Sequence, residues 1–198
     1  MKRHLLASAI AAGLAFATPT MAGTITYHGY DIAGPESYIT ISNATGVIGA
    51  ATIGQIVLHN TEYGNVYAWC VDLWHDLQGS GTYNVNTGST TLSDDLLGRI
   101  GALMAYSEGN AKTNALILPA TQLAIWMLEY PDLTFWNETR DGSVAEATAL
   151  LAMDMKPVYG MQELTADGNQ TLLKAPEPMT VLILGSAMVG LGLARRLV

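Results

Sequence analysis

The sequence predicts an α+β fold in which sandwich-like or barrel-like strands enclose a helical insertion. Short β-branched and aromatic runs, separated by glycine and asparagine turns, fill residues 23–71. Apolar residues then recur at helical spacing between residues 93 and 153, and a strand-like pattern returns at 158–173. Strands on both sides of a helical segment are typical of a single α+β domain.

Strands are expected at residues 24–27, 38–41, 53–59 and 65–72. The stretch over 78–91 is rich in Gly, Ser, Thr and Asn, so we expect it to be a polar loop. The final strand-like pattern is interrupted by Asp167-Gly168-Asn169, which favours a tight turn and predicts a hairpin.

Helices are expected over residues 93–106, 119–130 and 143–153. Ser93 is a good N-cap for the first helix. Pro119 suits the first turn of the second helix, and Pro131 stops it. This second helix is apolar nearly all round, which predicts that it is buried.

The charge pattern excludes some classes of partner and site. Residues 23–175 contain sixteen acidic and five basic residues, a net charge of −11, which disfavours binding to nucleic acid. No glycine-rich phosphate loop is present, and one cysteine with scattered histidines lacks the spacing of metal ligands. We therefore predict no cofactor and no metal.

The N-terminus is typical of a secretory signal peptide over residues 1–22. Lys2 and Arg3 precede an apolar run over 5–17, and small residues follow, which predicts cleavage after Ala22. Cleavage after Ala17 and a plain hydrophobic helix are the alternatives. The expected mature domain covers residues 23–174.

The tail over residues 175–198 contains three features in order: Pro176-Glu177-Pro178, an uncharged apolar stretch over 179–194, and Arg195-Arg196. This order predicts a short transmembrane segment with cytoplasmic arginines, so the precursor would be anchored in the inner membrane with its domain outside. The tail resembles the PEP-CTERM sorting signal of Gram-negative bacteria. That resemblance implies recognition by an exosortase-type protease, cleavage near Pro-Glu-Pro, and a final location on the cell surface or in the extracellular matrix. An ordinary tail anchor would give the same topology.

Cys70 is the single cysteine of an exported chain, so it cannot form an intramolecular disulfide. An inert buried thiol, an intermolecular disulfide, a catalytic nucleophile and a thiol used in another covalent bond all remain open. Catalysis is disfavoured because His75, five residues further on, would point to the opposite face of a strand.

Gln122 lies in the predicted buried helix, where an amide must find hydrogen-bond partners. It is either a hydrogen-bonded core residue or a residue whose side-chain carbonyl carbon is bonded to sulfur.

Two segments bear on these alternatives, Tyr67-Ala68-Trp69-Cys70-Val71-Asp72 and Thr121-Gln122-Leu123-Ala124-Ile125-Trp126. Together they resemble the TQXA thioester domain of bacterial surface adhesins. The resemblance implies an internal thioester between Cys70 and Gln122, formed with loss of ammonia, and a supporting shell of Thr121, Trp126, Asp72 and Trp69. Trp126 would lie on the same side of the helix as Gln122, and Asp72 would share the strand face of Cys70.

The resemblance implies a protein that attaches once, covalently, to an amine or hydroxyl nucleophile on a protein or polysaccharide, and that is not an enzyme. Two departures from the family are visible. Trp69 stands where Tyr, Phe or Leu is more usual, and a PEP-type tail replaces the LPXTG-type wall signal. The alternative is a structural matrix or adhesion protein, sorted by exosortase, that forms no thioester.

Overall fold

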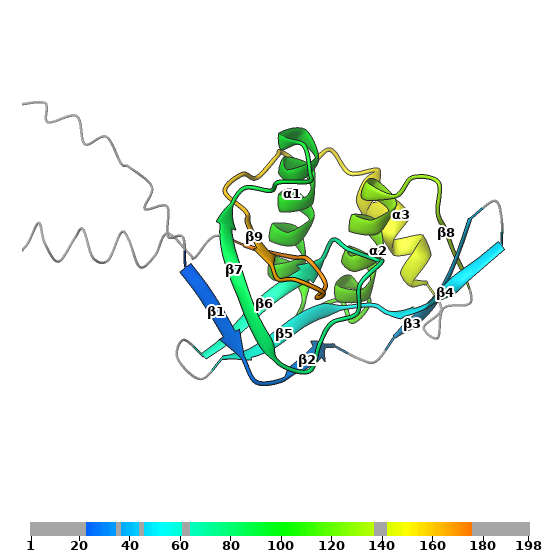
Figure 1. Ribbon diagram of the computed structural model, residues 1–198. Helices are drawn as coiled ribbons and strands as arrows, with labels where there is room; N and C mark the ends of the chain where they lie inside the picture. Colours follow the sequence, from blue (N-terminus) through cyan, green and yellow to red (C-terminus); the bar gives the residue numbers. More distant parts are fainter. Residues whose placement is uncertain (1–22, 35–36, 44–45, 61–63, 137–141, 176–198) are drawn as a thin grey trace, which may run out of the picture.

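The computed structural model describes residues 23–34, 37–43, 46–60, 64–136 and 142–175 (Figure 1). The predicted signal peptide with its cleavage position Ala22 lies outside the described residues, as does the predicted sorting tail with Pro176, Glu177, Pro178, Arg195 and Arg196. Within the described ranges, no helix has the length and apolar character needed to cross a bilayer.

The described elements follow one another as β1 (Gly23–Tyr27), β2 (Tyr30–Ala33), β3 (Tyr38–Asn43), β4 (Gly46–Thr52), β5 (Gln55–Asn60), β6 (Gly64–Cys70), β7 (Gly81–Thr87), α1 (Asp94–Asn110), α2 (Ile117–Glu129), β8 (Thr134–Trp136), α3 (Ser143–Leu151), β9 (Gln162–Thr165) and β10 (Leu172–Lys174). This order of strands, helices and strands agrees with the predicted α+β class.

The main sheet contains seven strands in the order β1-β7-β9-β10-β6-β5-β2, and the strand pairs within it are antiparallel. The sheet curls into a half-barrel, and α1 and α2 lie against it (Figure 1). A second sheet, β4-β3-β8, extends at one end of the molecule. The arrangement is therefore a half-barrel with helices packed on it.

The prediction of a polar loop over 78–91 is wrong, because β7 lies within this stretch. Tyr83 and Val85 are buried while the residues between and beside them are more exposed, which is the period of a half-buried strand. The Tyr83 ring stacks on Tyr27 of β1 with a centroid distance of 5.5 Å. Threonine and asparagine on the outer face hid this two-residue core pattern in the sequence.

The three predicted helices are present, with shifted ends. The Ser93 hydroxyl accepts a hydrogen bond from the Leu96 N–H at 3.3 Å, which confirms the predicted cap of α1. Helix α2 ends at Glu129, before Pro131, and is buried along most of its length, as expected. The predicted final hairpin is formed by β9 and β10, and Gly168 supplies a φ of 66° in the turn.

Candidate functional site

The structure brings Cys70 and Gln122 into direct contact. The Cys70 N–H donates to Gln122 Oε1 at 3.0 Å, and Gln122 Nε2 donates to the Cys70 carbonyl oxygen at 2.8 Å. Both residues are buried, with exposed fractions of 3% and 1%. Two residues that are 52 positions apart in the chain thus share one water-poor site.

The end of a strand ladder creates this contact. Pairing of β6 with β5 stops at Ala68, whereas pairing with β10 continues through Cys70. The N–H of the next residue, Val71, donates a hydrogen bond to the Thr171 carbonyl oxygen, on the β10 side. Because successive backbone groups of a strand point to opposite sides, the N–H and C=O of Cys70 face the other side, where pairing with β5 has stopped. The amide of Gln122 fills that position and takes the place of a peptide group in the ladder.

The chain turns immediately after Cys70 and folds back on its sulfur. The Cys70 thiol donates to the Asp72 carbonyl oxygen at 3.2 Å, and the Asp72 N–H approaches Sγ at 3.4 Å. Because β6 ends at Cys70, the prediction that Asp72 shares a strand face with Cys70 is wrong. Asp72 reaches the sulfur through its backbone, in a turn.

The carboxylate of Asp72 points to other partners. It accepts the Trp74 N–H at 2.9 Å and pairs with His75 Nδ1 at 2.7 Å. The expectation that His75 lies on the opposite strand face is also wrong, since His75 is in the turn region beyond the strand. His75 is exposed and is linked to the Cys70 region through Asp72.

The electrostatic setting keeps the thiol neutral. Burial raises the pKa of Cys70 to about 12, against the lowering effects of the Asp72 backbone and the Trp126 indole N–H. The carboxylates of Asp72 and Glu129 raise the pKa further. At neutral pH the sulfur therefore stays protonated, so it needs a proton acceptor to act as a nucleophile.

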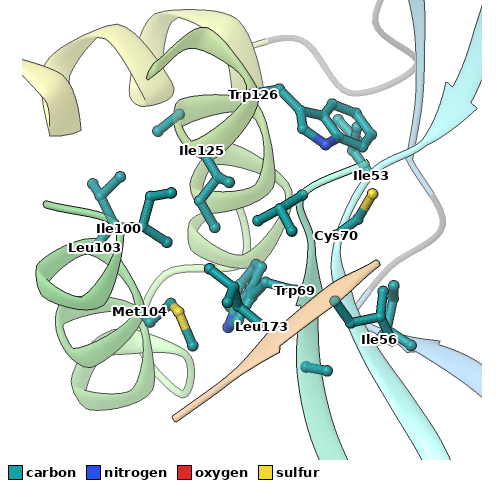
Figure 2. Close-up of a cluster of buried hydrophobic side chains, with 14 of the residues drawn as sticks. Ile53, Ile56, Trp69, Cys70, Ile100, Leu103, Met104, Ile125, Trp126 and Leu173 are labelled. Carbon is teal, nitrogen blue, oxygen red and sulfur yellow. The ribbon is translucent and has the colours of Figure 1, made fainter. Parts of the chain in front are cut away.

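The remaining predicted shell residues occupy different positions. Trp126 is buried and stacks on Phe135 at 6.3 Å, and its indole nitrogen faces the Cys70 side of the core (Figure 2). Thr121 is fully buried next to Gln122. Trp69 is buried opposite Leu173 of β10 and points away from the Cys70 sulfur, as adjacent strand residues do (Figure 2).

Sequence reasoning missed three residues around the site. The Tyr130 hydroxyl donates to the Val71 carbonyl oxygen at 3.1 Å, and Gln170 Nε2 donates to the Asp72 carbonyl oxygen at 2.9 Å. Glu129, at the end of α2, has a buried carboxylate oxygen, and burial raises its pKa to about 7. Its spacing of seven residues from Gln122 was a visible signal, since residues i and i+7 share a helix face.

Within the part of the chain that the structure describes, no three His, Cys, Asp or Glu side chains gather as a metal site would require.

No family model matches the sequence, and no relative was found among curated proteins. Among solved structures, the chain is similar to the N-terminal thioester domain of fibronectin-binding protein SfbI from Streptococcus pyogenes, with a TM-score of 0.44 and 14% sequence identity. The alignment covers 70% of this chain and 94% of that domain. Similarity at this level leaves the function to be argued from the site itself.

Proposed function

We propose that this chain is an exported surface or matrix protein in which Cys70 and Gln122 form an internal thioester for single-use covalent attachment. The observation that carries the proposal is the pair of hydrogen bonds between the Gln122 amide and the Cys70 backbone, in a buried site. These bonds hold the acyl group of one residue beside the residue that carries the sulfur. Such prior placement can remove several kcal/mol of a reaction barrier.

The proposed bond forms by attack of Cys70 Sγ on the Gln122 side-chain carbonyl carbon. A carbon–sulfur bond forms, the carbon–nitrogen bond breaks, and ammonia leaves with the former thiol proton. The Cys70 N–H on Oε1 stabilises the negative charge that develops on this oxygen, as an oxyanion-hole donor does. Burial then keeps water from the product.

The proposed thioester reacts only once. An amine or hydroxyl on a partner protein or polysaccharide attacks the Gln122 carbonyl carbon, the carbon–sulfur bond breaks, and Cys70 regains its proton. The partner is then attached by an amide or ester, and no step restores the thioester. The protein is accordingly proposed to be a consumable linker and not an enzyme.

Export forms the second part of the proposal and is supported by the sequence. A signal peptide over residues 1–22 would direct secretion, and the Pro176-Glu177-Pro178 tail would hold the precursor in the inner membrane until an exosortase-type protease releases it. The mature domain would then act at the cell surface or in the extracellular matrix.

A specific observation also favours the alternative, a structural matrix or adhesion protein without a thioester. The two hydrogen bonds satisfy the buried amide of Gln122 and the backbone of Cys70 without any covalent change. In this case Gln122 is a core residue that completes the ladder of β6.

Intact mass of the purified mature domain separates the two candidates. The proposal expects a mass lower by one ammonia than the sequence mass, and addition of one methylamine on treatment. Cys70→Ala should abolish both results, whereas Gln162→Ala, which changes a glutamine of β9, should preserve them. Full sequence mass together with an alkylatable Cys70 in the wild-type domain would reject the thioester.

A further inference from the structure

Helix α2 presents three functional groups along one stripe. Gln122, Trp126 and Glu129 are spaced by four and then three residues, so all three lie on the same side of the helix. Gln122 supplies the acyl carbon of the proposed thioester, and Trp126 covers the sulfur side (Figure 2). Glu129 is the third member of the stripe, and the attachment chemistry proposed above leaves it without a role.

One oxygen of the Glu129 carboxylate is free to accept a hydrogen bond. Its Oε2 atom is buried and has no hydrogen-bond partner within the described residues. A buried carboxylate oxygen is normally satisfied, because an unmade hydrogen bond costs about 1–3 kcal/mol. The side chain therefore keeps an acceptor position free at the cost of stability.

Among the described residues, the groups that act on the acidity of Glu129 lie near the Cys70 site. The hydroxyl of Tyr130 lowers the pKa of Glu129, and the charge of Asp72, in the turn after β6, raises it. The Glu129 carboxylate in turn raises the pKa of the Cys70 thiol at the end of β6. The Tyr130 hydroxyl in turn bonds to the carbonyl of Val71, the residue after Cys70. In the part of the chain that the structure describes, no positive side chain acts on Glu129, so no ion pair there holds the carboxylate permanently charged.

We propose that Glu129 carries the proton between the Cys70 sulfur and the nitrogen atoms that leave or attack Gln122. This inference rests on the proposed thioester function. In bond formation, Glu129 accepts the thiol proton as Sγ bonds to the Gln122 carbonyl carbon, and it returns that proton to the departing nitrogen, which leaves as ammonia. In attachment, it accepts a proton from the attacking amine and delivers it to Sγ as the carbon–sulfur bond breaks.

The acidities of the two groups suit this exchange. Burial raises the pKa of the Cys70 thiol to about 12, so few molecules ionise unaided at neutral pH. Burial raises the pKa of Glu129 to about 7, so its basic and acidic forms are both abundant there. A carrier with a pKa near the working pH is the most effective general acid–base.

The test measures the rate of methylamine addition to mature domain that carries the bond, as a function of pH, by intact mass. Wild type should show a rate that changes with ionisation of a group near pH 7. Glu129→Gln should react about 10²-fold more slowly, or form no thioester while still unfolding cooperatively, and should lose this ionisation. Glu129→Asp should retain the pH profile at a reduced rate.

A matched control is Glu108→Gln, which removes another helix carboxyl whose pKa is raised by burial but which is not among the groups that interact with Cys70. It should leave rate and profile unchanged. If Glu129→Gln forms the thioester and adds methylamine with the rate and pH dependence of the wild type, the inference about Glu129 fails but the proposed thioester function does not. If wild type carries no bond, the proposed function itself fails. Should Glu129→Gln not fold, Glu129→Asp decides: an unchanged rate overturns the inference.

Discussion

The side chain of Gln122 extends the β-ladder of Cys70, with one hydrogen bond to its N–H at 3.0 Å and one to its carbonyl oxygen at 2.8 Å. A helix residue therefore completes a strand at the point where the neighbouring strand has ended. The same contact explains how a polar amide is tolerated in the core and why its carbonyl carbon lies beside a thiol-bearing residue.

Loss of the Gln122 amide should destabilise the fold by orphaning two buried backbone groups. The comparison is made in a Cys70→Ala background, where no covalent bond can form but both backbone hydrogen bonds remain. Adding Gln122→Ala should lower the free energy of unfolding by about 1–3 kcal/mol for each group left without a partner. Urea denaturation measures this difference, and a change below about 0.5 kcal/mol would show that the amide does not satisfy the Cys70 backbone.

Helical periodicity and caps made the helices predictable from the sequence. Ser93 has a side chain that can cap the start of α1, and Pro131 excludes continuation of α2. The start of α1 and the end of α2 could therefore be predicted from the local sequence. Strand β7 was not predictable, because Tyr83 and Val85 are its only buried apolar residues and the residues around them are mostly threonine and asparagine. Its pairing with β1 and β9 is a tertiary relationship that outweighs weak local preference.

The pairing of Cys70 with Gln122 was expected from motif resemblance, and no local physical rule would have brought those two positions together. The error about Asp72 has a clear cause, since alternation along a strand applies only while the strand lasts, and β6 ends at Cys70. Glu129 was overlooked although its position followed from helix periodicity alone. Gln170 could not have been found, because only the register of β10 against β6 brings its neighbourhood to Asp72.

The indole N–H of Trp126 should assist departure of the Cys70 sulfur. This N–H is buried and makes no full hydrogen bond among the described residues, but it acts on the Cys70 sulfur and lowers the pKa of the thiol. Trp126→Phe keeps an aromatic ring over the site but removes the N–H, so methylamine addition should slow. Intact mass over time measures the rate. Trp136→Phe, at a half-exposed position of β8, is the control; a Trp126→Phe rate equal to or above wild type would contradict the expected role.

The packing of α1 against the chain before β9 should be intolerant of a single methyl group. A Cβ at Gly101 would lie 2.1 Å from the Val158 carbonyl oxygen, which is backbone and cannot rotate away. Gly101→Ala should therefore cost about 1–3 kcal/mol or more. Gly109→Ala, in the same helix but with nothing within 4 Å, should be neutral or stabilising by up to about 1 kcal/mol. Equal unfolding temperatures for the two variants would refute the close packing.

Glu129 should give the fold a stability that declines with rising pH. Burial raises its pKa from 4.5 to about 7, so the folded protein binds this proton more tightly than the unfolded chain does. Stability from this group is complete below about pH 4.5 and is lost as the pH rises through 7. Glu129→Gln is neutral throughout and should remove that decline. Urea unfolding of both proteins between pH 4 and 8, in the Cys70→Ala background, isolates the effect, because other titrating groups cancel in the difference. A difference that is flat with pH would mean that the carboxylate is solvated, and one of opposite sign would mean that it is held as an ion by a positive partner.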